Sequence, residues 1–125
     1  MYQNVAAAYQ AVEKETISGR ETEARVLTQA AIKLQNCQQN WGEKGHEQRL
    51  EEALRYNQKI WSIFQAELSR DDNPLPKQLA SNLLKLSIFI DRRIFDTIAS
   101  PSPEKLDAVI NINRNIAAGL RETPM

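Results

Sequence analysis

Residue types that do chemistry are few in this sequence. Of its 125 residues one is a histidine, His46, and one is a cysteine, Cys37. Catalytic and metal sites need several such groups brought together, and neither residue has a second His or Cys near it in the sequence. We therefore interpret His46 as a surface residue. We interpret Cys37, three positions after Leu34, as a small buried apolar side chain.

Motifs that hold a cofactor or a metal ion are also missing. The sequence contains neither of the glycine-rich patterns GxxxxGK[ST] and GxGxxG that cradle phosphates. A single cysteine cannot form an intramolecular disulfide or supply the cysteine pair of a structural zinc site. Asp71 and Asp72 lack the following glycine and glutamate of a calcium loop. The sequence thus predicts no catalytic, cofactor-binding or metal-binding residues and no enzyme activity.

Composition and charge are those of an ordinary globular protein. The chain is 42% hydrophobic and 26% charged, with 16 basic and 16 acidic residues and a formal net charge of zero. Opposite charges lie four residues apart, as in Glu21 with Arg25, a spacing typical of a solvated helix face. We expect one domain over residues 1–125, located in the cytoplasm, with no nucleic acid or membrane as partner.

The elements that position these residues are predicted to be helices. Apolar residues recur every three or four positions in each long segment, which is the period of an amphipathic helix. This pattern predicts an all-α, single-domain bundle of about five helices. They are expected at residues 2–14, 18–40, 46–70, 77–99 and from 103 to about 119, joined by segments rich in Gly or Pro.

Helix starts have recognisable signals at three places. Ser18 followed by Glu21 matches a capping box, which would begin the second helix after a break near Gly19. Asn73 or a neighbouring residue is suited to cap the helix after the proline-containing turn. Ser102 with Pro103 matches the N-cap and first position of the last helix.

Three features admit two interpretations each. Asn57 and Asn113 fall within apolar stripes, so each either fixes the register of the core or lines a groove and bonds a bound helix. The first helix, with Tyr2, Val5 and Tyr9 on one stripe, either completes the bundle or is a mobile arm that docks on a partner.

Three segments together resemble a known family. They are YNQKIWSIF at residues 56–64, NPLP at 73–76 followed by Leu83, Leu86, Ser87 and Phe89, and NINRNIAAGL at 111–120. Their order and spacing, together with the chain length, resemble the flagellar biosynthesis regulator FlaF of alphaproteobacteria over nearly the whole chain.

The resemblance implies a cytoplasmic protein needed for flagellin synthesis and secretion, acting with or against the regulator FlbT. Members of the family look like flagellin-binding export chaperones without catalytic residues. Our hypothesis is that an apolar groove of the bundle holds amphipathic terminal helices of flagellin until export. The alternative is a post-transcriptional regulator of flagellin expression that acts by capturing FlbT.

Under this hypothesis six residues are candidates for partner binding. Trp61 and Phe64 of the third helix and Phe89 of the fourth are the expected anchors, because large aromatic side chains are enriched at protein interfaces. Tyr2, Val5 and Tyr9 are expected to form a mobile gate.

Overall fold

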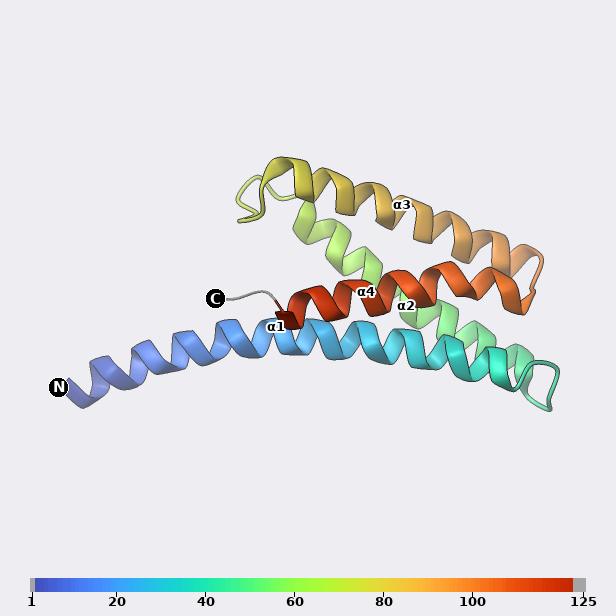
Figure 1. Cartoon of the computed structure of the whole chain (residues 1–125), viewed down its shortest axis with the longest axis horizontal. Helices are drawn as coiled ribbons and strands as arrows, with labels where there is room; N and C mark the ends of the chain where they lie inside the picture. Colours follow the sequence, from blue (N-terminus) through green and yellow to red (C-terminus); the bar gives the residue numbers. More distant parts are fainter. Residues whose placement is uncertain (1, 123–125) are drawn as a thin grey trace.

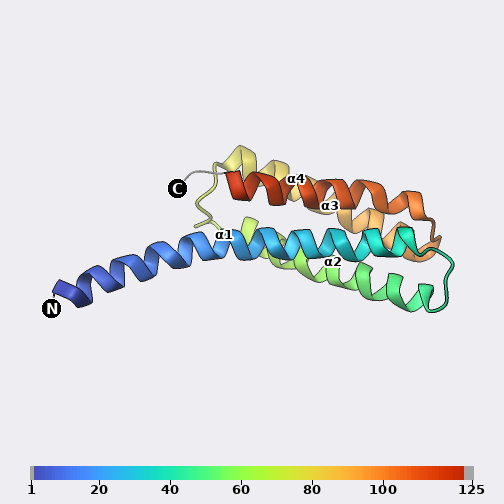
Figure 2. The ribbon, with the colours of Figure 1, turned by 60° about the horizontal axis from the view of Figure 1, so that its bottom comes forward.

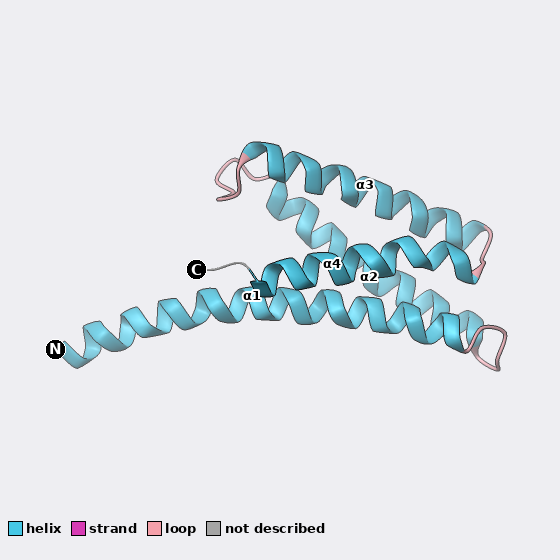
Figure 3. Ribbon diagram, in the orientation of Figure 1, coloured by secondary structure: helices cyan, strands magenta, loops and turns pink. Residues whose placement is uncertain are grey.

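A computed structural model describes the backbone of residues 2–122 and the side chains of residues 19–122. The chain forms α1 (Tyr2–Gln39), α2 (His46–Leu68), α3 (Lys77–Ala99), the short 3-10 helix η1 (Pro103–Leu106) and α4 (Asp107–Glu122). Figures 1 and 3 show the four α-helices. The described residues contain no strand, so the predicted all-α class is confirmed. The expected number of about five helices is wrong, because residues 2–122 form four α-helices.

The difference lies in α1, which continues through the expected break at Ser18-Gly19. The only glycines with positive φ among the described residues are Gly42 and Gly45, so Gly19 keeps a helical backbone. The carboxylate of Glu21 lies 3.4 Å from Arg25 and 3.6 Å from Arg121 of α4. We attribute the uninterrupted helix chiefly to the packing of α1 against α4 and α2, with buried Ala24 and Leu27 just beyond the glycine, which offsets the cost of one helical glycine, about 1 kcal/mol.

The connections fall where Gly and Pro predicted them. Gly42 and Gly45 have φ of 82° and 81°, a left-handed conformation in which residues with a Cβ are strained. Asn73 does not cap α3, since its side chain accepts from Leu75 N at 3.0 Å and donates to Glu67 O at 2.9 Å. Ser102 is the N-cap residue before Pro103, as predicted, but its side chain makes no capping hydrogen bond and the first turn is 3-10.

The helices pack in three pairs. α4 lies along α1, and α2 packs on both α1 and α3, while contact between α3 and α4 is sparse. Figure 1 shows α3 and α4 close together at the connection between them and farther apart towards their other ends. Figure 2 shows the N-terminal part of α1 extending beyond the other helices.

The core is built from the stripes that face inward on each helix. Small residues of α1 allow close packing of its neighbours, and larger apolar residues come from α2, α3 and α4. Its buried apolar residues are Ala24, Leu27, Ala30, Ala31, Leu34, Cys37, Leu50, Ala53, Leu54, Ile60, Trp61, Ile90, Ile94, Leu106, Val109, Ile110 and Ala117.

Candidate protein-binding cleft

An apolar cleft opens at the end of the bundle where α3 diverges from α4. It encloses about 330 Å³ and receives side chains from all four α-helices and from the turn before α3. Its lining residues are Arg20, Glu23, Leu27, Trp61, Phe64, Glu67, Leu68, Asn73, Pro74, Leu75, Leu83, Ile116 and Leu120. This volume is near the lower end of the roughly 300–1,000 Å³ of small-molecule pockets, enough for a few apolar side chains.

A chain of buried hydrogen bonds fixes the floor of the cleft. Trp61 Nε1 donates to Asn113 Oδ1 at 2.9 Å, and Asn113 Nδ2 donates to Asn57 Oδ1 at 2.7 Å. Asn57 Nδ2 in turn donates to the carbonyl oxygens of Ala53 at 2.8 Å and Ala30 at 3.2 Å. Since both asparagines are fully buried, they tie α1, α2 and α4 together and are not placed to bond a bound helix.

The three predicted aromatic anchors differ in position. Trp61 is 2% exposed and shows the cleft only a small part of its ring. Phe64 is partly buried and packs edge-on against Trp61, with ring centroids 5.7 Å apart. Phe89 is 40% exposed but does not line the cleft, and the guanidinium of Arg93 lies 5.4 Å from its ring centroid. The structure therefore brings Trp61 and Phe64 together and places Phe89 elsewhere.

Charged residues rim the cleft on the α1 and α2 sides. Burial raises the pKa of Glu23 above its ordinary value of 4.5, the nearby carboxylate of Glu67 adds to this, and Arg20 opposes it. The two carboxylates outnumber the one guanidinium among the charged residues that line the cleft, so the rim favours a guest that brings a positive charge. The side chains of Tyr2, Val5 and Tyr9, predicted as a gate, lie outside the described residues.

Cys37 and His46, the residues first considered for chemistry, both pack against other parts of the protein. Cys37 is buried, as predicted, and burial raises the pKa of its thiol, which disfavours the reactive thiolate. His46, interpreted from the sequence as a surface residue, is instead half-buried, because its ring packs edge-on against Trp41 with centroids 4.1 Å apart. Within residues 19–122 no group of three His, Cys, Asp or Glu side chains is placed to hold a metal ion.

Much of the cleft was not singled out from the sequence. The aliphatic wall of the cleft is formed by Leu75, Leu83, Ile116 and Leu120. In the sequence each of these residues lies on an ordinary apolar stripe or in a turn, so nothing marks it as part of a binding site. The one available signal was Leu75 itself, because a leucine between two prolines cannot enter a helix and is left for the surface.

The fold and the cleft define a small helical-bundle protein with an apolar recess on its surface. No helix of the described residues is long and apolar enough to cross a membrane. The chain belongs to the FlaF family: the family model described as flagellar protein FlaF matches residues 5–120. This membership implies a role connected with the flagellum. No curated protein and no solved structure matches the chain.

Proposed function

We propose that the chain is a non-enzymatic export chaperone that holds an amphipathic terminal helix of flagellin in the apolar cleft. The observation that carries this proposal is a recess with aliphatic walls at the open end of a helical bundle. Helix-in-groove binding uses such a surface, since apolar side chains of the guest, spaced three and four residues apart, replace water on the host.

The geometry supports a guest that inserts side chains between α3 and α4. Leu83 of α3 and Ile116 of α4 line the cleft, while Phe64 of α2 lies at its base. Because α3 and α4 contact each other sparsely, the two walls can separate slightly without breaking the α1 and α4 pairing. A basic residue of the guest would lie near Glu23 and Glu67 at the rim.

Isothermal titration of flagellin monomer into the purified protein tests this proposal. We expect Phe64→Ala to weaken binding roughly tenfold, because an anchor of this size contributes about 1–2 kcal/mol at an interface. Ile63→Ala is the matched control, since Ile63 is the next residue of α2, is 52% exposed and does not line the cleft. Circular dichroism shows whether each variant keeps its helices.

Equal affinity for flagellin in folded Phe64→Ala and in wild type would place the guest outside the cleft. The same titration with FlbT separates the alternative function. Binding of FlbT with no binding of flagellin would make the chain a regulator of flagellin expression and would overturn the chaperone proposal.

A further inference from the structure

The outer side of α3 carries large apolar side chains that the described part of the chain leaves uncovered. Phe95 is 76% exposed, Ile98 57% and Ile88 52%. Their spacing of seven and three residues places them on one stripe of the helix. Phe95 and Ile98 also line a shallow groove of about 410 Å³ beside α2. None of the three lines the cleft between α3 and α4.

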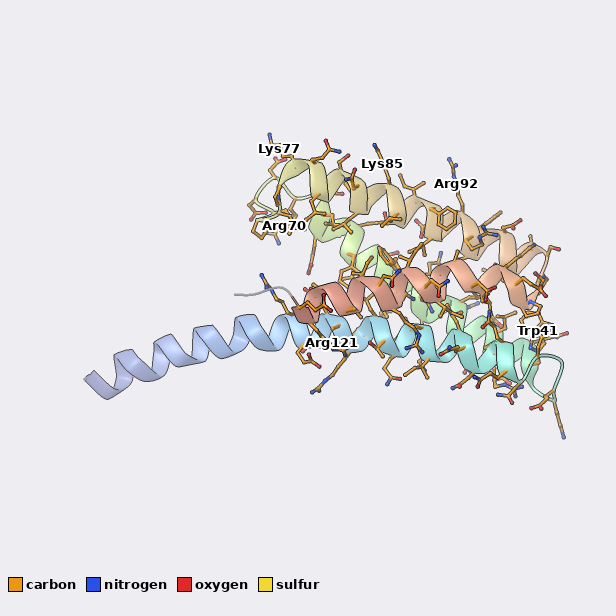
Figure 4. All side chains as sticks on the ribbon, viewed as in Figure 1. Trp41, Arg70, Lys77, Lys85, Arg92 and Arg121 are labelled. Atoms are coloured by element: carbon orange, nitrogen blue, oxygen red, sulfur yellow. The ribbon has the colours of Figure 1, made fainter. Side chains whose placement is uncertain are left out.

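Two opposite charges lie on either side of the line through Ile88 and Phe95. Asp91 lies about 50° to one side of this line, next to α2 and near Ile98, and Gln65 Nε2 donates to its Oδ2 at 2.8 Å. Arg92 is about 100° further around the helix, on the other side of the line, and Figure 4 shows its side chain pointing away from the bundle. Arg92 has no ion-pair partner among side chains 19–122.

We propose that this face, made of Ile88, Asp91, Arg92, Phe95 and Ile98, is a two-fold interface between two copies of this chain. In such an interface the same patch faces itself, so it must be complementary to itself. The apolar stripe is complementary to itself, because apolar side chains can pack against identical ones. The charges of Asp91 and Arg92 are complementary to themselves in only one orientation of the two helices.

That orientation has the two α3 helices running parallel. In a parallel pair the opposite edges of the stripe meet, as in parallel coiled coils. Asp91 of each copy then faces Arg92 of the other, and Phe95 packs against its own counterpart. An antiparallel pair would bring like edges together, Asp91 to Asp91 and Arg92 to Arg92, and would be opposed by repulsion.

An interface based on one helix face is small. Interfaces below about 1,200 Å² are weak and transient, so we expect monomers and dimers in a concentration-dependent equilibrium. The cleft between α3 and α4 remains open in this dimer, because the two surfaces share no residue.

Sedimentation equilibrium of the full chain over roughly a hundredfold range of concentration tests this inference. The wild type should dimerise within this range, and Phe95→Ser should remain a monomer with unchanged circular dichroism. The exposed Ile63 of α2 lies outside the stripe, so Ile63→Ser is the matched control and should dimerise as the wild type does. A monomeric wild type, or a Phe95→Ser variant that still dimerises, would overturn the proposal.

Charge variants test the predicted pairing. Asp91→Arg and Arg92→Glu should each lose dimerisation alone, because each gives both edges the same sign. An equimolar mixture of the two should form a heterodimer. Dimerisation of both variants alone at the wild-type level would contradict the pairing of Asp91 with Arg92.

A cysteine test decides the orientation. Ser81 is exposed on α3, about 15 Å along the helix from Asp91 at 1.5 Å per residue. In a parallel pair the two Ser81 positions are close, so Ser81→Cys should form a covalent dimer on mild oxidation. The exposed Ser69, beyond α2, is the matched control and Ser69→Cys should not. A wild-type dimer whose Ser81→Cys variant fails to crosslink would contradict the parallel arrangement.

Discussion

At the scale of single residues, the hydrogen-bonded chain from Trp61 through Asn113 to Asn57 sets the geometry below the cleft. Buried polar groups are costly unless bonded, and here the Trp61 indole and both asparagine side chains have partners inside the protein. These hydrogen bonds fix the rotation of α4 against α2, because only one register brings Asn113 to both Trp61 and Asn57.

Asn113→Ala should lower the free energy of unfolding by about 3 kcal/mol. It leaves the indole N–H of Trp61 and the side-chain oxygen Oδ1 of Asn57 without a hydrogen-bond partner in the core. Urea unfolding followed by circular dichroism measures the change. The matched control is Asn115→Ala, because Asn115 is exposed on the same helix. Equal unfolding midpoints for the two variants would show that the buried bonds do not stabilise the fold.

The raised pKa of Glu23 predicts a pH-dependent effect of its replacement. Where a folded-state carboxyl pKa lies above the ordinary 4.5, ionisation costs the folded state more than the unfolded one. Stability is therefore lost as pH rises from below 4.5 through the folded-state pKa. Glu23→Gln should be more stable than wild type at pH 7, and this advantage should shrink below about pH 4.

Urea unfolding of Glu23→Gln and wild type at both pH values measures this difference. A variant less stable than wild type at pH 7 would contradict the account, and so would an advantage of the same size at the acidic pH.

At the scale of elements, two exposed glycines give opposite predictions. Gly19 is inside α1 with helical backbone, and Gly42 has a φ of 82°. At neither position would an added Cβ meet a neighbouring atom within 4 Å. Gly19→Ala should raise the free energy of unfolding by about 1 kcal/mol, because alanine favours the helix.

Gly42→Ala should lower the free energy of unfolding by about 1 kcal/mol, because a Cβ strains the left-handed conformation. Thermal unfolding of both variants beside wild type measures the two shifts. A destabilising Gly19→Ala would indicate that the chain is not continuously helical at that residue.

Local sequence signals predicted the connections better than they predicted the first helix. Glycines at 42 and 45 and prolines at 74, 76, 101 and 103 act within a few residues, so they mark the loops correctly. The capping box at Ser18 and Glu21 was misleading because α1 packs along α4, and no local pattern in the sequence connects these two helices.

The cleft was predictable only in part for the same reason. Trp61 and Phe64 are conspicuous on one helix, but Leu83 and Ile116 face the same recess only because α3 diverges from α4. Sequence periodicity identifies which face of a helix is apolar. It does not specify how far two helices stand apart.

At the scale of the whole molecule, α3 contributes residues to both proposed binding surfaces, and the two sets of residues are separate. Leu83, near its beginning, lines the recess proposed for flagellin, while Phe95 and Ile98 lie on the outer stripe proposed for a second copy. Because the surfaces do not overlap, a dimer would carry two open clefts. Complexes with flagellin are then expected to contain two copies of each chain at high concentration and one of each at low concentration.

Amide hydrogen exchange of the protein with and without bound flagellin shows whether the cleft holds the flagellin helix. We expect slower exchange in the turn and early α3, residues 73–86, and in the last turns of α4, residues 113–120. In Phe64→Ala this protection should be much reduced at the same flagellin concentration. Flagellin binding that leaves both segments unchanged, or protects residues 88–99 instead, would contradict the claim that the cleft holds the flagellin helix.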